Sequence, residues 1–411
     1  MAKADLLLSL DQHGFDNIST QASLSASTPA DSSPWNIQLE LVHDIKNIEE
    51  DWKRLQSQRN CTIYQHFDWV MSAYETFEAR NESFVLIGRS NGNIKIILPL
   101  VLERGMFNRL RWAGDSHANM GSGLFCESIM NSINAKRMKD IVSSISKIAP
   151  PKTILQLPNQ MHKLGRFDNP FLLLPNSQSV NVIHWMDLTN GFEQMLRDGN
   201  AKRKRRKFRK QNEQADELGG YSFSEVKSHS AIRETLEEFF FMRGQRFAEL
   251  GIKNIFNDET VRSFIEKLAY SEPSDNCPLL RIFKLEIGGI TRAIYAGGQI
   301  EDHFQTAVNA ISIDEHMHIS PGEMLLWLMT ERLAQEGIHK IDFGAGDERY
   351  KRSWCQHEMA LFDTLLPLST STTPLIALIK SKNAAKSKIR NTPAIWNLFK
   401  KLRRMKSSFA G

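Results

Sequence analysis

Long hydrophobic runs are missing from this sequence. The longest extends only from Ile96 to Leu102 and contains Pro99, whereas about 20 consecutive apolar residues are needed to cross a bilayer. A secretory signal is not expected either, because Asp5 and Asp11 bracket the short apolar stretch near the start. The sequence therefore predicts a cytoplasmic protein without a transmembrane helix.

Several motifs of catalysis and metal binding are also missing. None of the four cysteines belongs to a CxxC pair, so neither a zinc site nor a disulfide framework is indicated. The chain contains no GxSxG elbow and no P-loop, which argues against covalent serine chemistry and nucleotide hydrolysis. His303, His316 and His318 have no carboxylate or cysteine at a matching spacing, so we expect no metal site.

Acidic residues are absent after Asp363, and that stretch contains ten lysines and arginines. The net charge of the whole chain is only +5, so the positive charge is concentrated in the tail, residues 371–411. Thr392-Pro393 predicts a helix start, and apolar residues recur after it at helical spacing beside lysines and arginines. We expect this basic amphipathic tail to dock on the body or to lie on anionic headgroups, which would make the protein peripheral at the inner face of the membrane.

The order of predicted helices and strands indicates a repeated domain. With 411 residues the chain is too long for one ordinary core. Residues 35–190 and 221–370 show the same order, β-α-α-β-β-β-α-β, which favours two α/β domains with mixed sheets over one large sheet. Residues 1–34 are rich in Ser, Thr and Ala and indicate a flexible leader.

Residues 191–220 connect the two copies and include a strongly basic run. Eight of the ten residues from Ala201 to Lys210 are Lys or Arg. On a helix these charges point in every direction, so we expect that the run is not buried and that the connecting helix packs only through Met195, Leu196 and Phe208. Two alternatives stay open: binding of a polyanion through its phosphates, and contact with a membrane surface.

The segment Ser320-Pro-Gly-Glu323 predicts the start of an apolar helix that runs to Gly337. Its first and last residues fit a capping box, Pro321 suits the first helical position, and Gly322 leaves room for close approach. Backbone N–H groups at such an end attract anions. An ordinary core helix with a good start explains the same residues, so both interpretations stay open.

The stretch Asp342-Phe-Gly-Ala-Gly-Asp-Glu-Arg-Tyr-Lys-Arg-Ser-Trp354 follows a strand-like segment. Strand alternation predicts that Asp342 faces away from the side on which Phe343 is buried, and Gly344 and Gly346 allow a sharp turn. The third glycine and the helix of a dinucleotide fingerprint are missing, so we reject a Rossmann fold.

Beyond that turn, three functional side chains follow within about one helical turn. Glu348 supplies a carboxylate, Tyr350 a hydroxyl and Lys351 an ammonium group. Together with Asp342 they are candidates for acid–base catalysis. A solvated helix start, whose acids are favourably placed by the helix dipole, is the alternative explanation.

These motifs resemble a known family, the GNAT-superfamily acetyltransferases associated with bacterial cellulose and exopolysaccharide biosynthesis. The resemblance covers about Trp35 to Leu366, and is carried by the stretch from Asp342 to Trp354, by Ser320-Pro-Gly322, by Arg243 to Arg246 and by the Trp52 to Trp69 region. It implies two tandem GNAT-like acyltransferase domains, as in Fem-type aminoacyltransferases. It also implies acyl transfer from acetyl-CoA or another acyl-CoA to an amine or hydroxyl of a small molecule, sugar or cell-envelope precursor. The family's usual pyrophosphate loop, Gln/Arg-x-x-Gly-x-Gly/Ala, is replaced by Ser320-Pro-Gly322.

The mechanism that we expect on this basis is direct transfer without a covalent intermediate or a metal. Asp342 or Glu348 accepts the proton of the acceptor, and Tyr350 protonates the leaving thiolate. Lys351, with Arg246, neutralises phosphate or the developing oxyanion. Donor binding is assigned to Ser320, Gly322 and Arg246.

Two other functions fit the same sequence. The first is an aminoacyl-tRNA-dependent, Fem-like aminoacyltransferase, which the two-domain plan and the basic run would suit and which predicts salt-sensitive RNA binding. The second is a non-catalytic GNAT-like scaffold in polysaccharide synthesis, which would bind no CoA thioester.

Overall fold

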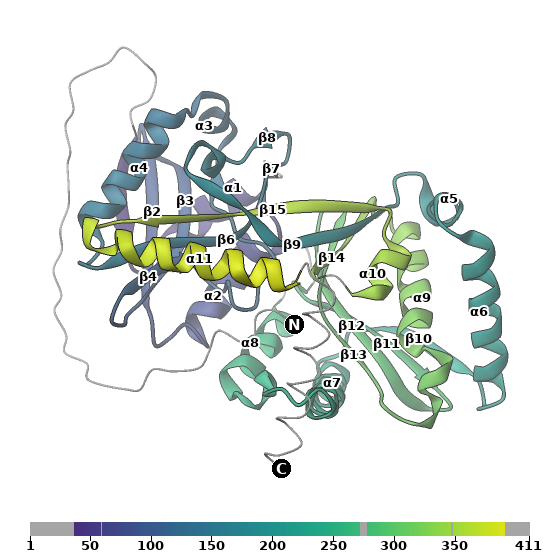
Figure 1. Cartoon of the computed structure of the whole chain (residues 1–411). Helices are drawn as coiled ribbons and strands as arrows, with labels where there is room; N and C mark the ends of the chain where they lie inside the picture. The colour runs from purple at the N-terminus through teal and green to yellow at the C-terminus, as the bar shows by residue number, and fades with distance from the viewer. Residues whose placement is uncertain (1–36, 59, 272–277, 347, 391–411) are drawn as a thin grey trace. The chain divides into compact units, whose positions relative to one another are not determined.

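The structure, a computed structural model, divides by contacts into two compact units (Figure 1). It describes residues 37–58, 60–271, 278–346 and 348–390, with side chains at all of these except 349 and 383–390. The described part of unit 1 is residues 37–180 with 360–386, and that of unit 2 is residues 181–359 with 387–390. The expected leader and the expected helix after Thr392 lie outside the described residues.

Unit 1 is built on a mixed sheet with the strand order β1-β2-β3-β4-β6-β15. β4 and β6 run parallel, and the other neighbours are antiparallel. The strands are β1 (Gln38–Val42), β2 (Glu82–Ser90), β3 (Asn93–Glu103), β4 (Asn108–Trp112), β6 (Thr153–Met161) and β15 (His357–Pro367), of which the part from Ala360 belongs to this unit. The helices are α1 (Glu49–Gln56), α2 (Phe67–Glu75), α3 (Glu127–Ser132), α4 (Ala135–Ile148) and α11 (Thr373–Arg390), which begins in this unit.

Unit 2 contains six neighbouring strands in the order β9-β14-β13-β12-β11-β10, of which only β13 and β14 are parallel to each other. The strands are β9 (Asn176–Asp187, from Asn181 in this unit), β10 (Tyr221–Val226), β11 (Arg281–Ile287), β12 (Ile290–Ile300), β13 (His303–Ile311) and β14 (Lys340–Ala345). The helices are α5 (Gly191–Asp198), α6 (Ala201–Asp216), α7 (His229–Glu249), α8 (Glu259–Tyr270), α9 (Pro321–Gln335) and α10 (Arg349–Trp354). Helices α7 and α8 cover one face of the sheet, and α9 with α5 and α6 covers the other (Figure 1).

The predicted α/β class with a repeated mixed-sheet plan is confirmed, because both units contain the order β-α-α-β-β-β-α-β. Strands β4, β9 and β15 and helix α11 were not expected from the sequence. The division by contacts also groups the chain differently from the expected boundaries. Residues 191–220 lie within unit 2, and residues 360–386 lie with unit 1.

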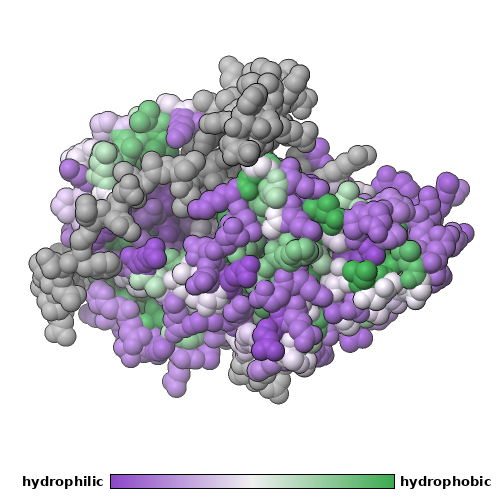
Figure 2. Space-filling view, turned by 90° about the horizontal axis from the view of Figure 1, so that it is seen from below, coloured by the Kyte–Doolittle hydropathy of each residue, from purple (hydrophilic) through white to green (hydrophobic). Residues whose placement is uncertain are grey.

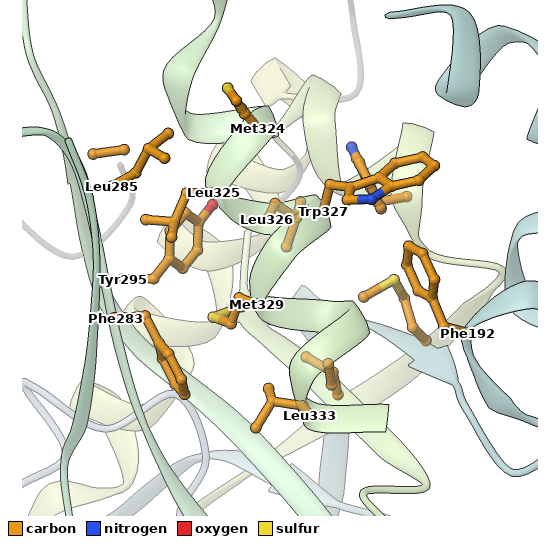
Figure 3. Packing of buried hydrophobic residues seen from close by; sticks show 14 of the residues in the cluster. Phe192, Phe283, Leu285, Tyr295, Met324, Leu325, Leu326, Trp327, Met329 and Leu333 are labelled. Carbon is orange, nitrogen blue, oxygen red and sulfur yellow. The ribbon is translucent and has the colours of Figure 1, made fainter. Parts of the chain in front are cut away.

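Helix α9 is buried on two sides (Figure 3). Toward the sheet its apolar side chains pack near Tyr295 and Phe283. On the other side, Trp327 stacks on Phe208 of α6, with ring centroids 4.6 Å apart and planes at 7°, and meets Phe192 of α5 edge-on at 5.0 Å. Because α9 is held from both sides, the position of its first turn is fixed by the core.

Helix α6 carries the basic run, and the expectation that none of it is buried is wrong. Lys204 is 6% exposed, and its Nζ lies 4.5 Å from the centre of the Trp354 ring. The aromatic face accepts the ammonium group, and the aliphatic stem packs along apolar surface. Met195 and Leu196 of α5 are buried and Phe208 packs against the core, as expected.

The surface in Figure 2 is mostly hydrophilic, and its hydrophobic side chains form separate small patches. None of the helices in the described part of the chain is long and apolar enough to cross a membrane. This agrees with the short apolar runs of the sequence.

Candidate functional site

The two parallel strands of unit 2 separate soon after they begin. Residues 303–305 of β13 pair with residues 340–342 of β14, and the pairing then stops. Beyond that point β13 stays bound to β12, while β14 pairs with β9 through an irregular register. Strands that part in this way leave backbone groups on their facing edges without a strand partner, and a ligand can pair with such edges.

In unit 1 the corresponding strands, β4 and β6, part in the same way, but a loop of the chain itself bonds to the edge of β6 that is left open. Residues 108–110 of β4 pair with residues 153–155 of β6. The loop after β4 then donates a hydrogen bond from the Gly121 N–H to the Asn159 carbonyl of β6, at 3.1 Å. A Cβ on Gly121 would lie 2.1 Å from the Trp112 ring, and one on Gly123 would lie 2.4 Å from Leu98. This loop is packed tightly, so unit 1 has no comparable open edge there.

The helices that follow these strands also differ at their first turns. In unit 1, the side-chain oxygen of Asn134 accepts a hydrogen bond from the Arg137 N–H at 3.0 Å and caps α4. In unit 2, Ser320 precedes α9 with a φ of 61° and makes no side-chain cap. The capping box predicted for Ser320 and Glu323 is therefore wrong, because the left-handed backbone of Ser320 turns its side chain away from the first turn.

Other parts of unit 2 hold the start of α9 instead. The Gln211 side chain of α6 donates to the carbonyls of Ile319 at 2.8 Å and Ser320 at 3.0 Å. Lys207 of α6 pairs with Glu323 at 2.7 Å. Gly322 is buried against β13, since a Cβ there would lie 2.4 Å from the Cδ1 of Ile311. These contacts fix the first turn and leave the anion-attracting end of α9 without a side-chain cap.

The turn after β14 is held by two buried charged residues. Gly344 and Gly346 have φ values of 69° and 125°, which confirms the expected sharp turn. Asp342, with no exposed surface, accepts a hydrogen bond from the Gly344 N–H at 2.6 Å. Lys351, 4% exposed, donates to the carbonyls of Gly344 at 3.3 Å and Ala345 at 3.1 Å. Both side chains therefore fix the shape of the turn.

Glu348 lies over the same turn and keeps contact with solvent. Its carboxylate pairs with Lys351 at 2.9 Å, while 48% of its side chain is exposed. It also lies 2.8 Å from where a Cβ of Gly346 would be, so a side chain at position 346 would displace it. Burial acts to raise the pKa of Glu348, but Lys351 outweighs this and holds the pKa below its usual range. Asp342 differs, since burial raises the pKa of that carboxyl.

Tyr350 of α10 is partly buried and packs against the core of unit 2. Its hydroxyl accepts a hydrogen bond from the Asn309 amide of β13 at 3.4 Å. A side-chain hydrogen bond with Tyr295 of β12 acts to lower its pKa. Burial raises the pKa of Tyr350 to about 12. The phenol is therefore a hydrogen-bond donor at neutral pH. Asn309 and Tyr295 were not expected at the site from the sequence, because their positions on β12 and β13 look like ordinary strand residues.

The structure brings Asp342, Glu348, Tyr350 and Lys351 together around one turn, but it places Arg246 apart from them. Arg246 lies on α7, where it is half-exposed and pairs with Glu249 at 2.8 Å. Arg243, one helical turn earlier on α7, has Tyr350 and Glu348 of the site among its electrostatic neighbours. The assignment of Arg246 to donor binding stays a prediction.

Comparison with known proteins identifies the fold. Residues 202–352 match the family model described as an acetyltransferase (GNAT) domain. No match was found among curated proteins. The chain is similar to the crystal structure of FemX, with a TM-score of 0.56 and 11% identity over 83% of this chain and 99% of that chain. It is also similar to a conserved protein of unknown function from Bacteroides thetaiotaomicron, with a TM-score of 0.52 and 12% identity over 80% of this chain and 100% of that one.

A tandem GNAT protein from the clavulanic acid biosynthesis pathway is similar at a lower TM-score of 0.46 and 11% identity, over 81% of this chain and 99% of that one. None of these descriptions names cellulose or exopolysaccharide synthesis, so that part of the expected family stays a prediction. The predicted pair of GNAT-like domains is confirmed by the likeness to FemX. The chain has a tandem GNAT-like fold, and its residues 202–352 match the model of a GNAT acetyltransferase domain.

Proposed function

We propose that unit 2 transfers an acyl group, with acetyl the first choice, from acyl-CoA to an amine or hydroxyl of a sugar or cell-envelope precursor. One contrast carries the proposal. The strands of unit 2 part beside a helix start without a side-chain cap, whereas in unit 1 a loop is bonded to the equivalent strand and Asn134 caps the equivalent helix. The extended pantetheine arm of the donor would pair along the open edge, and its diphosphate would meet the first turn of α9 near Gly322.

Glu348 is the base that this geometry favours. It is ionised and in contact with solvent, whereas Asp342 has no exposed surface and is engaged with the turn. Glu348 would accept the proton of the acceptor as its nitrogen or oxygen attacks the thioester carbonyl. The new C–N or C–O bond forms and the C–S bond breaks, so that CoA leaves as the thiolate.

Tyr350 would stabilise the leaving sulfur by a hydrogen bond rather than by giving up its proton. A phenol with a pKa of about 12 is a weaker acid than a thiol, whose pKa is about 8.5. Full proton transfer from Tyr350 to the thiolate is therefore unfavourable, and the thiolate takes its proton from solvent. Asp342 and Lys351 would act as positioning residues that hold Glu348 and Tyr350 on their turn.

Donor binding tests this proposal directly. Thermal unfolding is followed with acetyl-CoA, longer acyl-CoAs, CoA itself and tRNA. A ligand at 100 times its dissociation constant stabilises the native state by about 2.7 kcal/mol, so saturable stabilisation by one of the thioesters is expected. Absence of stabilisation by every CoA compound would refute the acyl-CoA proposal, and the scaffold function would then be favoured if tRNA also has no effect.

One observation favours the aminoacyl-tRNA alternative. Lys202, Arg206, Arg209 and Lys210 are exposed on α6, and none has a carboxylate partner among the described residues. Their spacing, i, i+4, i+7 and i+8, places them along one outward side of the helix. Such a row suits phosphate groups, and RNA binding by it would weaken steeply with salt. Replacing all four by Gln is then expected to flatten the salt dependence. Salt-independent or absent tRNA binding by the wild-type protein would remove this alternative.

A further inference from the structure

Three arginines of unit 2 lie over phenylalanine rings. The distances from the guanidinium carbon to the ring centre are 4.6 Å for Arg262 over Phe240, 5.2 Å for Arg281 over Phe283 and 4.8 Å for Arg243 over Phe247. Arg243 also lies 5.9 Å from the ring of a second phenylalanine, Phe256. Aromatic faces attract a guanidinium group and fix its plane, but they leave its five N–H donors unused.

Two of the three arginines use those donors within the protein. Arg281 donates to Glu225 at 2.7 Å and to Gln299 and Glu336 at 2.8 Å. Arg262 donates to the Phe256 carbonyl at 2.6 Å and lies 3.6 Å from Glu237.

Arg243 is the exception. In the described part of the chain it has no hydrogen bond and no ion pair, although the residue is partly buried. Burial lowers the pKa of Arg243, and the neighbouring positive charge of Arg246 lowers it further. No atom of Arg243 is among the fully buried polar atoms without a partner, so its donors reach solvent. The anion of a ligand can therefore accept hydrogen bonds from them in place of water.

The position of Arg243 relates it to the candidate site. Glu348 and Tyr350 of the candidate site are among the groups that influence Arg243 electrostatically, and neither residue bonds to it. Helix α7 covers the sheet face opposite to α9 (Figure 1). Arg243 thus belongs to the helix on one face of the sheet, whereas the start of α9, where the donor's diphosphate would bind, belongs to the other face.

We propose that Arg243 binds an anionic group, a carboxylate or a phosphate, of the acceptor molecule. The inference rests on the proposed transfer function and narrows its substrate class: the acceptor carries its amine or hydroxyl within reach of a negative charge. The planar fork of the guanidinium group suits both oxyanions, because two parallel N–H groups can bond two oxygens at once.

The test uses three amino sugars that differ in their charge. Glucosamine has no anionic group, glucosamine 6-phosphate adds a phosphate, and muramic acid adds a carboxylate. Dissociation constants are measured calorimetrically without any donor, for wild type, Arg243→Gln, Arg243→Lys and the control Arg262→Gln. Wild type is expected to bind one of the anionic sugars at least tenfold more tightly than glucosamine, and the one preferred identifies the oxyanion.

Arg243→Gln is expected to abolish that preference, and Arg243→Lys to keep part of it, because a lysine retains the charge but not the fork. Arg262→Gln removes a guanidinium that also lies on a phenylalanine ring, and is expected to lower thermal stability without changing the preference. If wild type and Arg243→Gln treat the three sugars alike, including the case in which neither binds any of them, the proposal is overturned.

A parallel titration with acetyl-CoA separates this inference from the proposed function. Arg243→Gln is expected to bind acetyl-CoA as tightly as wild type does. If the variant loses acetyl-CoA affinity but keeps the sugar preference, Arg243 belongs to the donor side and the inference is wrong. If acetyl-CoA binds to neither protein while the sugar preference depends on Arg243, the anion site stands and the acyl-CoA function fails.

Discussion

Replacing Lys351 by methionine tests whether the turn after β14 depends on one buried cation. The change keeps most of the side-chain length but removes the donor to the carbonyls of Gly344 and Ala345. Loss of each of these hydrogen bonds costs about 1 kcal/mol. The pair with Glu348 adds about 0.5 to 1 kcal/mol, because 48% of the Glu348 side chain is exposed and solvent screens it. We therefore expect Lys351→Met to lower the free energy of unfolding by about 2 to 3 kcal/mol.

Scanning calorimetry measures this loss, which corresponds to a Tm decrease of roughly 5 to 10 °C in a unit of this size. The control is Lys207→Met, which removes the ion pair between Lys207 and Glu323. The distance in this pair, 2.7 Å, is close to the 2.9 Å between Lys351 and Glu348, but both of its side chains are partly exposed. That variant is expected to change stability by less than about 0.5 kcal/mol. An equal, small effect in both variants would contradict the structural role given to Lys351.

The dependence of stability on acid pH is a second measurement of the same contact. Because the pKa of Glu348 is depressed in the fold, its contribution is present above its unfolded value of about 4.3 and is lost as the pH falls through the lower folded value.

Three further predictions follow from the same contacts. Glu348→Gln is expected to lower kcat by about 10²- to 10⁴-fold with unchanged acetyl-CoA affinity in calorimetry; a wild-type kcat would exclude this base. Burial raises the pKa of Asp342, so ionisation of this carboxyl opposes folding above its unfolded value. Asp342→Asn should therefore gain stability relative to wild type as the pH rises from about 4 to about 8, and a constant difference in denaturant titrations would refute this. Gly322→Ala places a methyl group against a flexible, exposed isoleucine, and we expect it to weaken acetyl-CoA binding at least tenfold with little loss of Tm. Gly121→Ala places the methyl group against a buried tryptophan ring. We expect this variant to destabilise unit 1 by about 1 to 3 kcal/mol without a change in acetyl-CoA binding. If Gly121→Ala weakened acetyl-CoA binding and Gly322→Ala did not, donor binding would belong to unit 1 instead of unit 2.

Local patterns in the sequence were enough to predict most of the repeated plan. The helix start at Pro321 and the turn at Gly344 and Gly346 depend on residues within a few positions, and both were found where expected. Strands β9 and β15 were missed because each pairs with a strand far away in the sequence. From Ala360 onward, β15 pairs with β6 about 200 residues earlier, as at Phe362 and Gln160. No local signal reports such a partner.

The errors at the site have the same origin. Ser320 looked like a helix cap, but Gln211 of α6 bonds the backbone around it, and its φ is positive. Lys204 looked solvated, but the Trp354 ring covers it. Arg243 was not singled out, because neither the rings beside it nor its missing acceptor can be read from spacing along a helix. Each case depends on a tertiary contact, and tertiary contacts override local propensity.

The two units share the same order of helices and strands, but this order does not decide which of them can catalyse a reaction. Both contain parallel strands that part after three residue pairs, and both place a helix between those strands. The difference lies in the connection after the first of them. In unit 1 that loop returns to bond Asn159 through Gly121, and after the short helix α3, which has no side-chain cap, the Asn134 side chain caps α4. In unit 2 the connection instead leads through residues 312–320 to an uncapped helix, and the polar residues gather on the turn after β14. A mutation that opened the unit 1 loop would expose strand edges without supplying any of those polar residues. Donor binding and chemistry are therefore expected from unit 2 alone.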